Sequence, residues 1–331
     1  MRRTILLMDL WTLADLSTPW CVHVVATLRV ANHIEAGHSE IAELAHAAGA
    51  DRDSLERVMR HLVSKGLFEE PAHGRFALNE IARGLLDNGM LLGLNLDSFG
   101  GRMAHAWGTL LSAVRNGKPA YHEAFGRGFW EDMDAHPELA AAFDDLMGPK
   151  GHGKPDPEVL VNPADWASIR TVVDVGGGAG WLLAEILRAH PAVRGTLVDG
   201  ERAVAKSPAV FEQAGVADRA QAVAQSFFDS LPAGADLYTL KSVLHDWADT
   251  EARAILRRCA EAAAPNGRVV VFTKSTEGEE ASPELLMLVL VGGRDRSLEE
   301  FRELARSAGL EVTATGKQAS GKGIVECRVT I

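Results

Sequence analysis

The sequence predicts an α/β protein with a mostly parallel, seven-stranded sheet in its C-terminal half and a helix-rich domain before it. Two observations lead to this prediction. Strand-like and helix-like segments alternate from about residue 170 onward, and such alternation produces a parallel sheet with right-handed crossovers. Over residues 5–36, in contrast, apolar side chains recur at helical spacing.

A glycine-rich turn at Arg170–Trp181, RTVVDVGGGAGW, is the segment around which the chain is organised. A β-branched apolar run ends in an acid, and four glycines precede a helical pattern. This pattern is typical of a buried parallel strand followed by a turn where no side chain obstructs a ligand. Turns of this kind bind nucleotides through backbone N–H groups near a helix N-terminus. A turn without a ligand is the alternative. The dinucleotide fingerprint requires glycine where Trp181 stands, so the spacing argues against that class.

Composition places the chain among ordinary soluble proteins and excludes several partners. Its 331 residues suffice for two domains, and 47% are hydrophobic and 24% charged. A net charge of −11 argues against nucleic acid or an anionic membrane surface. The three cysteines are far apart and lack metal-ligand spacing, which indicates a reducing cytoplasm and no metal centre. Asp9 interrupts the first apolar run, so we expect neither a signal peptide nor a membrane span.

The N-terminal domain has the pattern helix, turn, helix, hairpin of a winged helix. Ser39 is expected to cap a helix over Glu40–Ala48, and Asp53 a second helix over Ser54–Lys65. Leu67–Leu78 alternates around a turn as a two-stranded wing does.

A winged helix has two common uses, DNA binding and dimerisation. In the first case Arg57, Arg60 and Lys65 would lie on a recognition helix. Residues 1–90 hold nine Lys or Arg against twelve Asp or Glu, a net charge of about −3. DNA-reading domains are basic, so the charge favours a dimerisation module.

The middle of the chain is helical in pattern and rich in aromatic side chains from Leu91 to Met147. Most of these rings are expected in the core, and some in the wall of an aromatic substrate pocket. Gly148–Glu158 is rich in Gly, Pro and Lys and is typical of a linker. We therefore expect a dimerisation domain over 1–90, a connecting and substrate-lid region over 91–155, and the α/β domain over 156–331.

The α/β domain ends in a hairpin around a Ser-Gly-Lys-Gly turn, which makes the last strand antiparallel. The expected strands are Thr171–Val175, Gly195–Asp199, Ala220–Phe227, Asp236–Leu244, Arg268–Thr273, Leu310–Thr315 and Gly323–Ile331. The expected helices between them are Leu182–Ala189, Arg202–Ala214, Glu251–Ala263 and Leu298–Ala308, the last with a capping box from Ser297 and Glu300.

Five motifs occur in a characteristic order: DVGGGAG (Asp174–Gly180), Val198-Asp199, SFFDSLP (Ser226–Pro232), LKSVLHDW (Leu240–Trp247) and GGRDRS (Gly292–Ser297). With them the chain resembles the small-molecule O-methyltransferases that use S-adenosylmethionine. This family includes plant phenolic enzymes and bacterial enzymes that tailor aromatic polyketides. FGRGFWEDM (Phe125–Met133) and FDDLM (Phe143–Met147) resemble the bacterial branch of the enediyne naphthoate and anthracycline pathways. The resemblance covers nearly the whole chain.

The resemblance implies a Rossmann-like methyltransferase domain behind a winged-helix dimerisation domain. It also implies a homodimer, a small hydroxylated aromatic substrate, S-adenosylmethionine as cofactor with S-adenosylhomocysteine as product, and no metal. The implied cofactor-binding residues are Asp174, Gly176, Gly178, Asp199, Ser226, Phe227, Lys241, Ser242, Trp130, Phe143 and Met147. Asp199 would accept the ribose hydroxyls; the alternatives are a turn-forming Asp199 and a solvated Lys241.

The resemblance also implies that His245 is the catalytic base, at the end of the fourth strand. A neutral imidazole, with a pKa near ~6.5, can accept the proton of a phenol with a pKa near ~10 as the oxygen attacks. The alternative is a histidine at a helix start that binds only backbone. The residues implied to lie beside the acceptor are Asp246, Ser98, Arg102 and Met287.

One position departs from the family pattern. Relatives flank the base with two carboxylates, whereas here Thr273 stands at the first position and Asp295 at the second. Asp295 is expected to orient His245, unless it serves only its own loop. The departure leaves open a non-methylating relative, such as a hydroxylase. A third possibility, a regulator that senses a ligand, is disfavoured by His245 and by the acidic N-terminal domain.

Overall fold

The computed structural model describes residues 10–148, 156–273 and 283–330. Their contacts divide the chain into two units: Met1–His105 with Glu138–Gly151, and Ala106–Pro137 with His152–Ile331. The helical region predicted to connect the domains is thus shared between both units, and most of the predicted linker lies outside the described residues. None of the described helices is long and apolar enough to cross a membrane.

The N-terminal unit packs helices and a two-stranded hairpin around one apolar core. The hairpin falls where the sequence predicts it, whereas the long helical stretch before it is interrupted by Arg29, whose φ of 54° is left-handed. Its elements are α1 (Leu10–Leu13), α2 (Ser17–Thr27), α3 (Val30–Glu35), α4 (Ile41–Ala48), α5 (Arg52–Ser64), β1 (Phe68–Ala72), β2 (Arg75–Leu78), α6 (Glu80–Arg83), η1 (Gly84–Leu86), α7 (Asn88–Leu94), α8 (Phe99–Ala106) and α12 (Pro137–Met147).

Both helix caps predicted in this unit are wrong. The residue before α4 is Glu40, with no side-chain cap, and the Ser39 backbone carbonyl instead accepts a bond from Phe76 N. Helix α5 begins two residues earlier than predicted, so Asp51 caps it and accepts a bond of 2.9 Å from Ser54 N. Asp53 then lies within the first turn.

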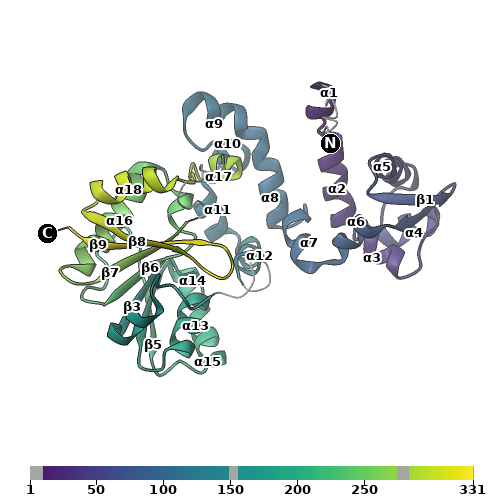
Figure 1. Ribbon diagram of the computed structural model, residues 1–331. Coiled ribbons are helices and arrows are strands. Elements are labelled where there is room, and N and C mark those ends of the chain that lie inside the picture. Colours follow the sequence, from purple (N-terminus) through teal and green to yellow (C-terminus); the bar gives the residue numbers. More distant parts are fainter. Residues whose placement is uncertain (1–9, 149–155, 274–282, 331) are drawn as a thin grey trace, which may run out of the picture. The chain divides into compact units, whose positions relative to one another are not determined.

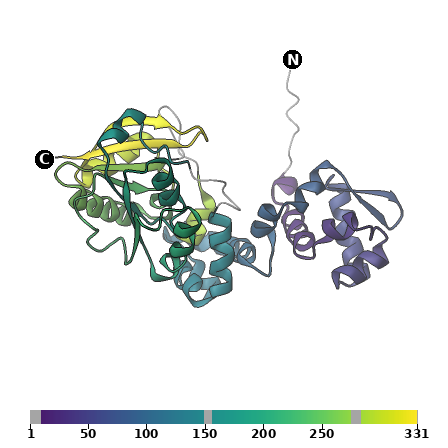
Figure 2. The ribbon, with the colours of Figure 1, turned by 90° about the horizontal axis from the view of Figure 1, so that it is seen from below.

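The second unit contains a seven-stranded sheet of order β5-β4-β3-β6-β7-β9-β8 (Figure 1). All pairs are parallel except those of β9, which runs antiparallel to both β7 and β8. Figure 2 shows the β8–β9 hairpin at the edge of the sheet. The predicted sheet, including its antiparallel last strand, is confirmed. The strands are β3 (Thr171–Val175), β4 (Arg194–Asp199), β5 (Ala220–Ala224), β6 (Leu237–Leu240), β7 (Arg268–Thr273), β8 (Leu310–Lys317) and β9 (Gly323–Val329).

Helices cover both faces of this sheet. On β3, Val173 and Val175 join the core that contains α16 (Asp249–Ala263) and α18 (Leu298–Ser307). Val172 points the other way, into the core with α13 (Trp181–Ala189) and α15 (Ser207–Gln213). Because both faces are buried, the central strands read as continuous apolar runs rather than as alternating patterns.

Three predicted elements in this unit are wrong by three residues or more, or by a break. The fourth strand ends at Leu240, because Ser242 adopts a left-handed φ of 58° that a strand cannot continue through. Strand β5 ends at Ala224. The helix predicted over Arg202–Ala214 is two helices, α14 (Glu201–Val204) and α15, and Pro208 lies in the first turn of the second.

Shorter helices complete the second unit. Helix α9 packs against α17, and a Cβ placed on Gly292 would lie 2.6 Å from Pro119 Cδ, so the loop after α17 touches the loop that follows α9. These elements are η2 (Trp107–Thr109), α9 (Leu110–Asn116), α10 (Tyr121–Phe125), α11 (Phe129–Ala135), η3 (Pro163–Ser168), η4 (Leu244–Asp246) and α17 (Leu285–Leu290).

Candidate active site

The glycine turn after β3 requires its glycines. Gly176, Gly178 and Gly180 have φ values of 68°, 62° and 86°, in the left-handed region where side chains are strained. A Cβ on Gly176 would lie 2.6 Å from Val243 Cγ2, whereas a Cβ on Gly178 would meet no described atom within 4 Å. The turn therefore packs tightly against the protein at Gly176 and is open at Gly178.

Asp199, at the end of β4, holds this turn. Its Oδ2 accepts a bond of 2.7 Å from Gly178 N, and its Oδ1 accepts one of 2.7 Å from Gly200 N. Asp199 is therefore turn-forming, which the sequence analysis gave as the alternative to ribose binding. Its carboxylate also lies beside Gly178, where the turn is open.

Asp174, inside the sheet, is fully buried and shapes the turn from below. Its Oδ1 accepts a bond of 2.8 Å from Thr239 Oγ1, and a Cβ on Gly177 would overlap its carboxylate. Burial raises the pKa of Asp174 to about 6, against the opposing effects of the Thr239 bond and the Lys241 charge. Lys241 is not simply solvated: burial and the charge of Lys322 lower its pKa, while Asp174 raises it. Charges at this edge of the sheet therefore influence one another.

His245 lies on η4, the turn that follows β6. The chain enters it through Ser242 in its left-handed conformation, a kind of strain that collects at functional sites. The imidazole Nε2 lies 3.2 Å from Asp246 Oδ1, and the two side chains are 22% and 17% exposed. Since Val243 of the same turn contacts Gly176, the His245 turn lies against the glycine turn. Asp246 was predicted beside the acceptor, and the structure shows that it contacts the imidazole.

The segment after β5 reaches the same place. A Cβ on Gly176 would lie 3.6 Å from Phe227 Cε1, and the Phe227 ring meets the Trp247 ring edge to face at 5.9 Å. Ser226 is exposed, and its hydroxyl accepts a bond of 3.2 Å from Phe228 N. The segments that follow β3, β4, β5 and β6 thus contact one another around Gly176 and Gly178.

The loop before α18 also contacts the His245 turn. A Cβ on Gly293 would overlap the His245 carbonyl oxygen, so the two backbones are in direct contact. Asp295 is buried in this loop at 6% exposure. Thr273 ends β7, paired with Gly323. The roles of Asp295 and Thr273 toward the base stay predictions.

The other predicted site residues of this unit come from the short helices. Trp130 lies on α11 and packs edge to face on Phe129 at 4.9 Å. An Arg202–Asp134 ion pair of 3.3 Å ties α11 to α14, which directly follows Asp199. Met287, on α17, is half-buried.

Four predicted residues belong to the N-terminal unit: Ser98, Arg102, Phe143 and Met147. The Phe143 ring packs on Phe99 at 5.1 Å, Ser98 and Arg102 are half-buried, and Met147 is exposed. Their part in binding stays a prediction. Over the described parts of the chain, no group of three or more His, Cys, Asp or Glu is arranged to hold a metal ion.

Comparison with known proteins decides the family. Residues 107–311 match the model of the O-methyltransferase domain, and residues 11–88 match that of the O-methyltransferase dimerisation domain. The chain belongs to this family. It is therefore an O-methyltransferase that uses S-adenosylmethionine, and its dimerisation domain supports the predicted homodimer.

Similar members of the family act on aromatic polyketides. The chain is 46% identical over 307 residues to the 2,7-dihydroxy-5-methyl-1-naphthoate 7-O-methyltransferase of Streptomyces carzinostaticus, covering 91% of this chain and 92% of that one. It is 36% identical to the aclacinomycin 10-hydroxylase of Streptomyces purpurascens, covering 91% and 83%. A solved O-methyltransferase of neocarzinostatin biosynthesis, in complex with S-adenosyl-L-homocysteine and 1,4-dihydroxy-2-naphthoic acid, is 44% identical with a TM-score of 0.89, covering 97% and 99%.

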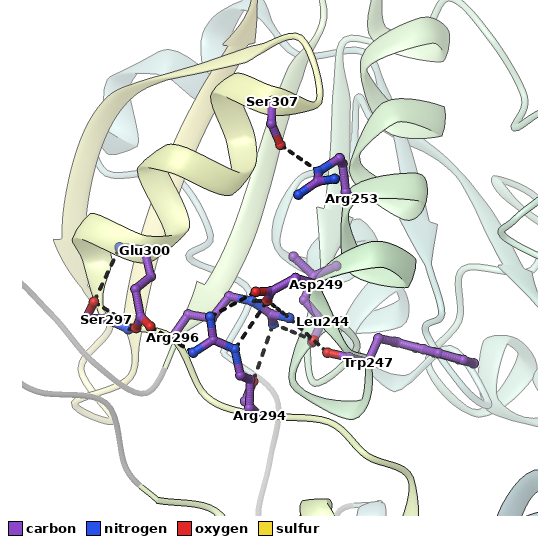
Figure 3. A network of polar contacts seen from close by, with 9 residues as sticks. All are labelled: Leu244, Trp247, Asp249, Arg253, Arg294, Arg296, Ser297, Glu300 and Ser307. Atoms are coloured by element: carbon purple, nitrogen blue, oxygen red, sulfur yellow. Dashed lines mark hydrogen bonds and ion pairs between the residues drawn. The ribbon is translucent and has the colours of Figure 1, made fainter. Parts of the chain in front are cut away.

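Sequence reasoning missed two residues that hold this O-methyltransferase site together. Arg296 donates to the carbonyls of Leu244 and Trp247, on either side of His245, and to Asp249 (Figure 3). The only signal in the sequence is an Asp at a helix start and an Arg-Asp-Arg run. Every residue has a backbone carbonyl, so the sequence cannot indicate which carbonyls Arg296 binds.

Proposed function

We propose that this O-methyltransferase methylates a hydroxyl of an aromatic, polyketide-type natural product, with His245 as the general base. The observation that carries the proposal is the position of His245: its turn contacts the glycine turn through Val243 and Gly176, and its imidazole contacts Asp246. The relatives that methylate a naphthoate support the substrate class.

The open glycine turn fits the proposed cofactor. Gly178 has space that a Cβ would fill, and it lies beside the Asp199 carboxylate. A carboxylate can accept charge-assisted bonds from two neighbouring hydroxyls, which is the role proposed for Asp199 toward the ribose. Phe227 supplies an aromatic face beside Gly176. Asp174 is proposed to shape the turn from inside the sheet instead of touching the ligand, because it is fully buried.

In the proposed reaction, bound S-adenosylmethionine supplies an activated methyl group that the acceptor oxygen attacks in line. His245 takes the proton from the hydroxyl, so that the oxygen does not attack as a neutral phenol. Asp246, 3.2 Å from Nε2, favours the tautomer with its proton on Nε2, in which Nδ1 carries the lone pair. The same carboxylate then stabilises the imidazolium.

We also propose that the enzyme acts in the cytoplasm. Its three cysteines are all free, and two of them, Cys259 and Cys327, are buried. Unpaired cysteines are typical of proteins in a reducing compartment.

Mass spectrometry tests the proposed function. Wild-type enzyme and S-adenosylmethionine are incubated with hydroxylated naphthoates, anthraquinones and benzoates, beginning with 2,7-dihydroxy-5-methyl-1-naphthoate. We expect one acceptor to gain a methyl group. His245→Ala should cut turnover by roughly 10²–10⁴-fold, the range for a lost general base, and should leave S-adenosylmethionine affinity nearly unchanged in calorimetry. Raising the pH should partly restore the rate. Equal turnover of His245→Ala and wild type at neutral pH would exclude the base.

Hydroxylation is the second candidate function. The similarity to an aclacinomycin 10-hydroxylase and the threonine at position 273 favour it. The same assay, run in air with a thiol reductant that supplies the two electrons for dioxygen, separates the two, because hydroxylation adds an oxygen atom to the acceptor and methylation adds a methyl group.

A further inference from the structure

A buried arginine connects the His245 turn to two other elements. The side chain of Arg296 is 5% exposed, and its guanidinium makes five contacts. Its Nη1 donates to Leu244 O at 2.9 Å and to Arg294 O at 3.3 Å, and its Nη2 donates to Trp247 O at 2.8 Å. Its Nε and Nη2 also reach Asp249 Oδ1, at 2.9 and 2.8 Å. A guanidinium has five N–H groups on three nitrogens, and these four hydrogen bonds and one ion-pair contact engage all three nitrogens.

These contacts support the His245 turn, because one of the two hydrogen bonds within the turn is long. Asp246 N donates to Val243 O at 3.1 Å, and Trp247 N donates to Leu244 O at 3.4 Å, close to the limit for such a bond. The bond from Arg296 to the same Leu244 oxygen is shorter, at 2.9 Å. The two carbonyls that Arg296 binds precede and follow His245, so the guanidinium fixes the backbone on both sides of the imidazole (Figure 3).

Asp249 fixes the guanidinium in turn. It is the first residue of α16, where the helix dipole favours a negative charge. Partial burial raises its pKa, but hydrogen bonds from Arg294 and Arg296 outweigh this and keep the pKa below its ordinary value. Arg294 Nη2 binds Asp249 Oδ2 at 3.0 Å, and Arg294 Nη1 binds Glu300 Oε1 at 2.7 Å. The chain of contacts runs from α16 to the capping box of α18.

We propose that Arg296 and Asp249 are positioning residues for the catalytic base: they lock the 3-10 turn so that His245 meets the acceptor hydroxyl. This inference rests on the proposed role of His245. A catalytic group displaced by 1 Å can lose roughly 100-fold in rate. Holding the backbone on both sides of His245 would therefore offset the cost of burying the charged Arg296 side chain.

Arg296→Lys is the first test. A lysine keeps the charge but lacks the planar fork that binds two carbonyls and a carboxylate together. With 2,7-dihydroxy-5-methyl-1-naphthoate or the acceptor found in the panel, kcat should fall roughly 10- to 100-fold, while S-adenosylmethionine affinity stays within about 2-fold of wild type. The defect should shrink at high pH, as for His245→Ala, because an ionised phenol needs no base.

The matched control is Arg253→Gln. Arg253 also joins α16 to α18, through a 2.9 Å bond to Ser307 Oγ, and Figure 3 shows it away from the His245 turn. Its loss should leave kcat and the pH profile unchanged. Asp249→Asn is the milder test if Arg296→Lys does not fold: it keeps an acceptor for Arg296 but removes the charge, and it should lower kcat by roughly 3- to 10-fold with the same recovery at high pH.

A double variant separates this inference from the function on which it rests. If Arg296 acts through His245, then His245→Ala with Asp249→Asn should be no slower than His245→Ala alone. Multiplying defects, or normal kcat in Arg296→Lys or Asp249→Asn, would overturn the positioning role while the base assignment stands. If His245→Ala itself is as fast as wild type, the base assignment within the proposed function fails first.

Discussion

Individual side chains in this site do more than one task. Asp199 accepts bonds from the N–H groups of Gly178 and Gly200 and is proposed to bind the cofactor. Asp246 was assigned to the acceptor from the resemblance, but its carboxylate lies on His245 Nε2. A neighbouring residue in a 3-10 turn can thus supply the charge that Thr273 does not supply.

Replacing Asp246 tests which carboxylate orients the base. Asp246→Asn should lower turnover by roughly 10-fold and move the acidic limb of the pH–rate profile to lower pH, because a negative charge nearby favours imidazolium. Asp295→Asn is the comparison, and Thr273→Val should have a milder effect than either. The measurement is kcat against pH for each variant. If Asp246→Asn matches wild type while Asp295→Asn is slow, then Asp295 orients His245 and Asp246 does not.

Asp174 makes stability depend on pH. Its folded-state pKa is about 6, above the ordinary 3.8, so the folded state holds a proton that the unfolded state has lost between these values. Stability is therefore lost as pH rises through this window. Asp174→Asn keeps an acceptor for Thr239 and does not titrate. We expect its stability relative to wild type to rise by on the order of 1–3 kcal/mol between pH 4 and about 7.

Urea unfolding of wild type and Asp174→Asn across this pH range measures the effect. Asp218→Asn is the control, since its side chain is 76% exposed and should show no such trend. If the stability of Asp174→Asn relative to wild type stays constant, or falls as pH rises, the raised pKa of Asp174 is contradicted.

At the scale of elements, the sequence predicts the limits of strands that are set by side-chain packing. It misses limits that are set by an unusual backbone conformation. Strands β3 and β7 match their predicted limits, because an apolar run buried on both faces has clear ends. The end of β6 was missed because Ser242 turns the chain in a left-handed conformation. Serine rarely adopts this conformation, and no pattern in the sequence predicts it here. The α5 cap was assigned to the wrong one of two neighbouring aspartates.

Helix α18 provides a measurable case of a correctly predicted cap. Ser297 and Glu300 form the expected capping box, in which Ser297 Oγ accepts from Glu300 N at 3.3 Å and Glu300 Oε2 accepts from Ser297 N at 2.8 Å. Ser297→Ala should cost about 1 kcal/mol of the free energy of unfolding. Ser39→Ala is the matched control and should cost almost nothing, because Ser39 caps no helix. Equal losses in chemical denaturation would contradict the assignment.

For the whole molecule, the sequence was sufficient for the mostly parallel sheet with its antiparallel last strand and for the family. It was insufficient for the contacts of Arg296, because carbonyl acceptors are common to every residue. The start of the described chain presents an exposed apolar surface: Leu10, Trp11 and Leu13 of α1, and Leu16 just before α2, are large, apolar and exposed. Surfaces of this kind commonly mark a partner, in agreement with the dimerisation domain over residues 11–88.

Sedimentation tests this partner surface. The wild type, with a chain mass of 35.5 kDa, should sediment as a dimer at micromolar concentration. Trp11→Glu with Leu13→Glu should raise the dissociation constant by roughly 100-fold or more, since charge would enter an apolar contact. Trp11→Phe keeps the apolar surface and should remain dimeric. A compact wild-type monomer at this concentration would rule the dimer out.

The turn that carries His245 is contacted closely by two other loops, because Gly176 lies against Val243 and Gly293 lies against His245 itself. Neither glycine can gain even one methyl group without moving its neighbour. Few substitutions in these loops are therefore tolerated when the enzyme evolves to accept a new acceptor molecule. Changes of specificity, natural or engineered, should accumulate in the surrounding helices α9, α11 and α17, whereas the three loops that meet at the turn should be inherited as a unit. A laboratory library restricted to those helices should retain more active members than one of equal size in the loops.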